Sequence, residues 1–254
     1  MPFFTEYQAV TFLLILARVS GIFIASPIFE SKTVPMRYKI GFSIIVALIL
    51  FPVVAPVEQL PKTLPHLAFL CAGQALFGFF LGTCTAFVFA AIQVAGALMD
   101  TQIGFAMATL LDPSNRSPLT LLSYWFNWVA LILFFAINGH HWLLLGIINS
   151  FKVIPVDQFV LTANFIEYMI RLFSNILPVA FHISIPMLIS LLLLDIVMGF
   201  ITKIAPALNI MIVGYPFKIG MGLIFLVSYF PFLIQIFIRY FDHLQKPLLQ
   251  MFYM

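Results

Sequence analysis

The chain has 254 residues, of which 63% are hydrophobic and only 8% are charged, and its formal net charge is +3. A soluble domain carries roughly 25% charged residues, so this composition excludes an ordinary soluble domain and indicates an integral membrane protein. The 30 Phe residues exclude a disordered chain, and the sparse basic residues provide no basic face for nucleic acid.

Six hydrophobic segments follow one another along the chain, if about 20 apolar residues are taken as the length that crosses the hydrocarbon core. They run over residues 7–26, 40–57, 63–99, 117–151, 172–194 and 219–238. The third and fourth are too long for one perpendicular helix, because about 35 residues reach roughly 50 Å against a core of about 30 Å. Each of these two is a tilted helix, a helix with a broken end or two shorter pieces. Basic residues divide almost evenly between alternate loops, so the positive-inside rule predicts no orientation.

Turn signals predict where these segments end or break. Gly96 and Gly104 loosen the end of the third segment, and Asp112-Pro113 predicts a loop before the fourth. The Asn138-Gly139 dipeptide predicts a turn inside the fourth segment.

Two charged residues interrupt the apolar segments: Arg18 lies in the middle of the first, and Asp195 follows the fifth. A charge at the bilayer centre costs about 3 kcal/mol on translocon scales, so such residues face protein, water or a partner. We interpret both as structural residues, in an ion pair or at a protein interface, with a proton or ion relay as the alternative. Four amides are expected to form hydrogen bonds between helices: Gln74, Gln93, Asn127 and Gln235.

Small residues recur at every fourth position of the third segment, at Gly78, Gly82, Ala86 and Ala90. This spacing places them on one face of a helix and permits another backbone to approach closely. The approaching helix belongs either to this chain or to another subunit, and the stripe does not distinguish the two.

The segment from Gly104 to Pro113 combines Phe, Met and Leu with small residues and ends in a turn. A hydrophobic loop with flexible side chains could form a compressible seal across an aqueous pore. In a soluble protein the same residues would be ordinary core, and spacing alone leaves both interpretations open.

The sequence contains no catalytic or metal-binding motif. GxSxG, a Walker loop and HExxH are all missing. His140 and His141 are adjacent, so on a helix they diverge by about 100° and cannot bind one metal ion together. We therefore expect no enzyme activity, no metal and no cofactor.

Several short motifs, in their order and spacing, together resemble the FliR family of the flagellar export apparatus, called SctT in injectisomes. The first motifs are Ala17-Arg18-Val19-Ser20-Gly21, Ser26-Pro27-Ile28-Phe29 and Val34-Pro35. The middle of the chain contributes Gly96, Asp100, Gln102, Gly104-Phe105, Asp112-Pro113 and Asn138-Gly139-His140-His141. The last block holds Asp195, Gly199-Phe200, Lys203, Ala205-Pro206, Gly214, Pro216 and Lys218. Family members often carry Glu where this chain has the shorter Asp195.

This resemblance implies one all-α export-gate domain over residues 1–254, built from long, bent helical hairpins. Residues 1–171 would be its FliP-like part, and residues 172–254 a FliQ-like hairpin and tail. The implied function is that of a structural pore subunit of the flagellar type III export gate, a multi-pass protein of the bacterial inner membrane within the basal body. The implied partners are FliP-like, FliQ-like and FlhB-like subunits, and unfolded flagellar proteins in transit.

The resemblance also implies roles for individual residues. The family's pore plug corresponds to residues 105–119, and its implied gate residues are Phe105, Met107, Leu110, Leu111, Asp112 and Pro113. Structural or intersubunit polar roles are implied for Arg18, Asp100, Gln102, Asp195, Lys203 and Lys218. Among these, Lys203 and Lys218 are expected to contact an FlhB-like or FliQ-like neighbour.

Two alternatives remain. A secondary transporter would use Arg18 and Asp195, with a fifth segment broken at Pro178 and Pro186. Transporters usually show two matching halves, and no repeat is visible here. The second alternative is the equivalent subunit of a virulence injectisome, since no single residue separates the two uses.

Overall fold

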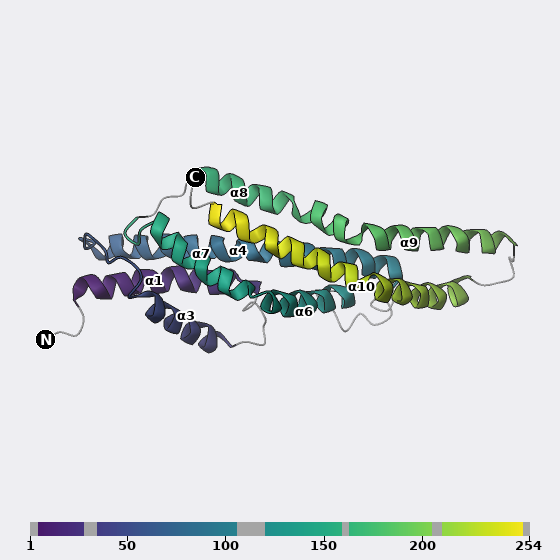
Figure 1. The fold of residues 1–254 in the computed structure, drawn as a ribbon, viewed down its shortest axis with the longest axis horizontal. Helices are drawn as coiled ribbons and strands as arrows, with labels where there is room; N and C mark the ends of the chain where they lie inside the picture. The colour runs from purple at the N-terminus through teal and green to yellow at the C-terminus, as the bar shows by residue number, and fades with distance from the viewer. Residues whose placement is uncertain (1–4, 28–34, 106–119, 159–162, 205–209, 251–254) are drawn as a thin grey trace. The chain divides into compact units, whose positions relative to one another are not determined.

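The computed structural model describes residues 5–27, 35–105, 120–158, 163–204 and 210–250, and over these residues it contains helices and no strand (Figure 1). The helices in chain order are α1 (Glu6–Ala25), α3 (Met36–Leu50), α4 (Leu64–Ile103), α6 (Leu121–Ala136), α7 (Gly139–Val153), α8 (Ala163–Ser174), α9 (Ile176–Ile204) and α10 (Ile210–Gln250). The predicted all-α fold is confirmed.

Among the described residues, four helical stretches are long and apolar enough to cross a membrane. They are Glu6–Ala25, Leu64–Ile103, Ile166–Ile204 and Gly214–Asp242, and α6 with α7 would make a fifth span, bent by 69°. The count of six is not confirmed, because α3 has only 15 residues, about 22 Å of helix. Pro52 lies directly after its C-cap residue Phe51 and has no backbone N–H to continue the helix.

The turn signals have different outcomes. Asn138 adopts the left-handed conformation, with φ 59°, between α6 and α7, so the predicted turn is confirmed. Gly104 has φ 103° directly after α4, a conformation that glycine adopts without strain. Gly96 instead lies inside the continuous α4 and does not mark its end. Helix α9 continues through Pro186, where a break was predicted.

The chain packs as two compact units. Unit 1 contains residues 1–88, 138–173 and 241–254, and unit 2 contains residues 89–137 and 174–240. Helix α4 begins in unit 1 and ends in unit 2. It is one helix of 40 residues, so the third hydrophobic segment is not two shorter pieces.

In unit 1, α1 lies along the first half of α4 (Figure 1). Leu14 and Ile15 of α1 are fully buried in one cluster with residues of α4 and α7. Gly78 and Gly82 allow this approach, since a Cβ at Gly78 would overlap the carbonyl oxygen of Arg18, and one at Gly82 would overlap that of Ile22. The glycine half of the small-residue stripe therefore packs against a helix of the same chain.

In unit 2, aromatic contacts join the end of α4 to α6, α6 to α10, and α9 to α10 through His182 and Tyr240. Phe89 of α4 meets Phe134 of α6 at a ring-centroid distance of 5.8 Å, and Phe126 of α6 meets Phe237 of α10 at the same distance. Its buried aliphatic side chains include Ile92, Met99, Ile103, Ile183, Met187, Leu191 and Leu233.

Candidate functional site

A carboxylate near the end of α4 caps the start of α6, the helix that follows residues 106–119 in the chain. The Oδ1 atom of Asp100 accepts a hydrogen bond of 3.0 Å from the backbone N–H of Leu122, and both residues are buried. The first N–H groups of a helix have no partner within the helix, and a negative charge there is stabilised by the helix dipole. Thr120 is the N-cap residue of α6 and accepts from the N–H of Ser123.

Close backbone contact strengthens this connection between α4 and α6. The hydroxyl of Ser123 donates to the carbonyl oxygen of Gln93 at 2.7 Å, and the amide of Gln93 donates to Asn127 Oδ1 at 2.8 Å. A Cβ at Gly96 would lie 2.7 Å from Cα of Ser123, so glycine is needed for this approach. The prediction that Gln93 and Asn127 form interhelical hydrogen bonds is confirmed.

These contacts join the helix before the predicted plug, residues 105–119, to the helix that follows it in the chain. Phe105 is half-buried directly after Gly104, and Thr120 begins the other side. The remaining predicted gate residues fall outside the described residues: Met107, Leu110, Leu111, Asp112 and Pro113.

The end of α4 rests on α10. A Cβ at Gly222 would lie 2.9 Å from the Ile103 side chain, and one at Gly104 would lie 3.5 Å from the Tyr215 ring. Tyr215 also lines a pocket of about 300 Å³ between α9 and α10. The other residues lining this pocket are Asp195, Met198, Gly199, Thr202, Gly214 and Lys218.

Asp195 and Lys218 form an ion pair inside this pocket. The ammonium of Lys218 lies 2.7 Å from Oδ1 and 2.8 Å from Oδ2 of Asp195, so both carboxylate oxygens are engaged. The lysine side chain is 19% exposed and the aspartate side chain 46%. Asp195, although shorter than Glu, thus reaches a base on α10. The other two polar residues with implied intersubunit roles, Lys203 and Gln102, are exposed.

Arg18 lies at the centre of a buried polar cluster in unit 1. Its Nε donates to Gln74 Oε1 at 2.6 Å, its Nη1 to Ser150 Oγ at 3.1 Å and its Nη2 to the carbonyl oxygen of Ile154 at 2.9 Å. The guanidinium also lies 4.1 Å from the ring centroid of Phe151, a favourable cation–π geometry. No carboxylate among the described residues pairs with Arg18, so neutral acceptors satisfy a fully buried charge.

The amide of Gln74 extends the cluster. Its Nε2 donates to the carbonyl oxygens of Val156 and Gln158, at 3.0 and 3.1 Å. Gln74 was expected to bridge helices, but Ser150 and the carbonyl groups after α7 were not identified from the sequence. The sequence offers one indirect signal for them: all lie in the part of the chain that follows the turn at Asn138, at or just after the end of α7.

These arrangements suit packing and positioning more than bond chemistry. Within the described ranges, no three His, Cys, Asp or Glu side chains gather closely enough to hold a metal ion. Arg18 and Asp195 lie in different units, and each has its own hydrogen-bond partners. Gln235, the fourth amide of the interhelical prediction, is exposed.

Comparison with known proteins adds the following similarities. Residues 9–244 match the model of the family described as bacterial export proteins, family 1. Flagellar biosynthetic protein FliR of Bacillus subtilis is 33% identical over 219 residues, covering 85% of this chain and 84% of that protein. FliR of Escherichia coli is 28% identical over 216 residues, with 85% and 82% covered. FliR of Aquifex aeolicus is 25% identical over 229 residues, with 89% and 88% covered.

Proposed function

Because this chain belongs to the FliR family of bacterial export proteins, we propose that it is a structural pore subunit of the flagellar type III protein export gate. In this role it assembles with FliP-like, FliQ-like and FlhB-like subunits in the bacterial inner membrane, within the basal body. Unfolded flagellar proteins pass through the assembly.

The observation that carries this proposal is the polar connection between α4 and α6. Asp100 and Ser123 fasten the two helices on either side of residues 106–119. A hydrophobic segment whose two ends are fixed to rigid helices can close a pore and return to the same place after each passage. We assign the closing role to Phe105, Met107, Leu110 and Leu111, with Asp112-Pro113 as the turn.

The surface of α9 supports the proposed assembly. In the most apolar window of Ile166–Ile204 only 11% of the residues are buried. Large apolar side chains are exposed at every third or fourth position of α9: Leu177, Phe181, Ile185, Ile189, Leu192, Ile196, Phe200 and Ile204. A continuous apolar face of this kind requires lipid or other subunits to cover it. The proposed FliQ-like part, residues 172–254, begins in the last turn of α8 and includes this helix.

A plug experiment tests the pore role. Leu110→Asp with Leu111→Asp should increase ion leakage across the inner membrane in cells that are making flagella. The matched control is Leu110→Met with Leu111→Met, which keeps the segment apolar and should not leak. An unchanged leak in the Asp variant would remove residues 105–119 from the gate.

Co-purification tests the assembly. The chain should co-purify with the FliP-like and FliQ-like subunits of the same genome when all are expressed together. A chain that purifies alone under these conditions would contradict the proposed function. Charge reversal at Lys203, which is exposed, should weaken the contact with an FlhB-like or FliQ-like neighbour. Assembly and motility that stay intact in the Lys203 variant would contradict that contact. Lys218 is held by Asp195 of the same chain, so its reversal tests that ion pair instead.

The transporter alternative has less support. It is motivated by Arg18 and Asp195 as charges in apolar segments, but each is already engaged within the chain, Arg18 by neutral acceptors and Asp195 by Lys218. It is also motivated by a segment broken at Pro178 and Pro186. The helix is interrupted at Asn175, shortly before Pro178, whereas α9 continues through Pro186. The relatives described above carry flagellar names, which favours flagellar over injectisome use.

A further inference from the structure

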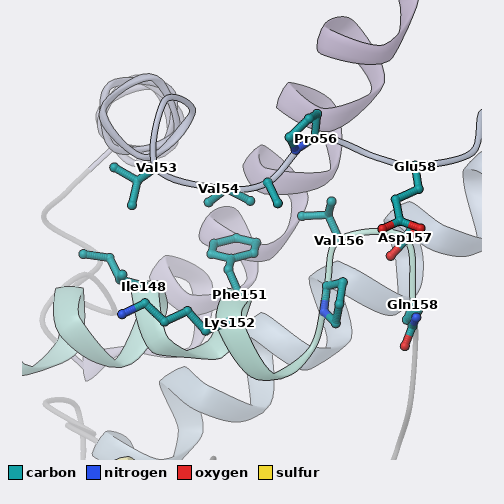
Figure 2. Close-up of a pocket in the computed structure, with 12 residues that line it drawn as sticks. Val53, Val54, Pro56, Glu58, Ile148, Phe151, Lys152, Val156, Asp157 and Gln158 are labelled. Atoms are coloured by element: carbon teal, nitrogen blue, oxygen red, sulfur yellow. The ribbon is translucent and has the colours of Figure 1, made fainter.

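A groove of about 310 Å³ lies in unit 1, between the segment that follows α3 and the end of α7 (Figure 2). One side is formed by residues 53–56 and Glu58, and the other by Ile148, Phe151, Lys152 and residues 155–158.

Buried polar side chains hold the backbone of both sides in place. On one side, the N–H of Val57 donates to Thr11 Oγ1 at 3.1 Å. On the other, Arg18 and Gln74 donate to the carbonyl oxygens of Ile154, Val156 and Gln158. Thr11, Arg18 and Gln74 are each at most 1% exposed. The groove is therefore formed in advance, which lowers the entropy cost of binding.

The floor of the groove is apolar. Figure 2 shows the Phe151 ring between Val54 and the end of α7, with Val156 beside it. The guanidinium of Arg18 stacks on the Phe151 ring and fixes its orientation. Pro56 and Pro155 line the groove without a backbone N–H of their own, so hydrogen bonds to an occupant must come from other groups.

The charges of the groove are separated along its length. Figure 2 shows Glu58 and Asp157 pointing toward one another at one end, and Lys152 reaching toward Ile148 at the other. Neither carboxylate has an ion-pair partner among the described residues. Two carboxylates facing one space repel each other unless a cation lies between them. The groove therefore favours an occupant with a positive charge at this end.

We propose that the groove binds an extended peptide segment of a neighbouring gate subunit, with a Lys or Arg side chain between Glu58 and Asp157. An apolar side chain next to this base covers Phe151 and Val54. This occupant rests on the proposed function, because it presupposes the assembled gate. A lipid tail fits less well, since both ends of the groove are charged and burying those charges in hydrocarbon is costly.

Site-specific photo-cross-linking tests this contact in the full chain, co-expressed with the FliP-like, FliQ-like and FlhB-like subunits. p-Benzoylphenylalanine replaces Val53, which lines the groove and is 62% exposed. The control position is Val153, which is 43% exposed and does not line the groove. We expect Val53, and not Val153, to cross-link to one subunit peptide with a basic residue next to an apolar one.

Charge variants then test the chemistry. Glu58→Gln with Asp157→Asn should reduce the cross-link by about tenfold or more, whereas Glu6→Gln, an exposed acid outside the groove, should not. If the double variant yields no complex, Glu58→Gln alone serves, because Glu58 is exposed. Glu58→Lys should also abolish the cross-link, and reversing the charge of the partner's basic residue should restore it.

The outcomes separate the groove from the proposed function. A complex that co-purifies but cross-links at Val53 only to lipid, to nothing or to a peptide without a basic residue overturns the occupant and leaves the pore role intact. A chain that fails to co-purify at all overturns the proposed function and the occupant together.

Discussion

Arg18 allows the sharpest test of how unit 1 is held together. Changing it to Met removes a fully buried guanidinium that donates to three acceptors on α4, α7 and the segment after α7. The side-chain amide oxygen of Gln74 and the backbone carbonyl oxygen of Ile154 then lose their donor in the protein interior. Each unsatisfied buried acceptor costs about 1–3 kcal/mol, while removal of the desolvated charge recovers part of this loss.

We therefore expect Arg18→Met to destabilise the protein by about 2–4 kcal/mol. In a chain of this size each kcal/mol shifts the midpoint of thermal unfolding by about 2–4 °C, so the midpoint should fall by roughly 5–15 °C. Arg18→Lys should be nearly as harmful, because one ammonium keeps the cost of burial but cannot reproduce the planar fork. Size-exclusion chromatography of heated, detergent-solubilised protein measures these midpoints.

Arg171 provides the control. Its ion pair with Glu167 spans one turn of α8, and both side chains are more than half exposed, so Arg171→Met should cost less than about 1 kcal/mol. Refutation would be an Arg18→Lys protein with the wild-type midpoint. That result would mean that a positive charge, and not the three-way fork, is what unit 1 requires.

Three further predictions concern the helix contacts. Gly78→Ala should destabilise the protein by about 1–3 kcal/mol, because its Cβ would overlap backbone of α1. A Cβ at Gly146 meets open space, so Gly146→Ala should stabilise the protein by about 0.5–1 kcal/mol. Equal thermal midpoints for the Gly78→Ala and Gly146→Ala proteins would contradict this explanation from packing. Asp195→Asn or Lys218→Met alone should reduce motility, because each removes the ion pair between α9 and α10. The exchange Asp195→Lys with Lys218→Asp should restore motility, and single variants with wild-type motility would contradict this prediction. Asp100→Ala should cost about 1–2 kcal/mol and raise ion leakage, whereas Asp100→Asn keeps an acceptor for α6 and should behave like wild type.

Local signals in the sequence predicted the features that depend on a few neighbouring residues. The Asn138 turn follows from a dipeptide that tolerates the left-handed conformation. The closeness at Gly78 follows from spacing alone, although spacing did not reveal that the approaching helix is α1. The structural interpretation of Arg18 agrees with its buried hydrogen bonds.

Long-range partners were beyond the reach of the sequence. Ser150 Oγ and the Ile154 carbonyl oxygen lie more than a hundred residues from Arg18, with sequence separations of 132 and 136. A backbone carbonyl leaves no mark in the sequence as an acceptor. The count of six segments is not confirmed for a different reason: hydropathy adds up apolar residues and does not register that Pro52 follows the end of α3.

The neutral partners of Arg18 have a consequence for acid tolerance. An ion pair between a base and a carboxylate weakens when acid protonates the carboxylate, but Gln74, Ser150 and a backbone carbonyl do not titrate near neutral pH. Arginine itself keeps its proton throughout that range. The two compartments of a bacterium can therefore differ in pH, and the cytoplasm can acidify when the proton gradient collapses, without loosening this cluster. The walls of the groove beside it keep their shape under both conditions.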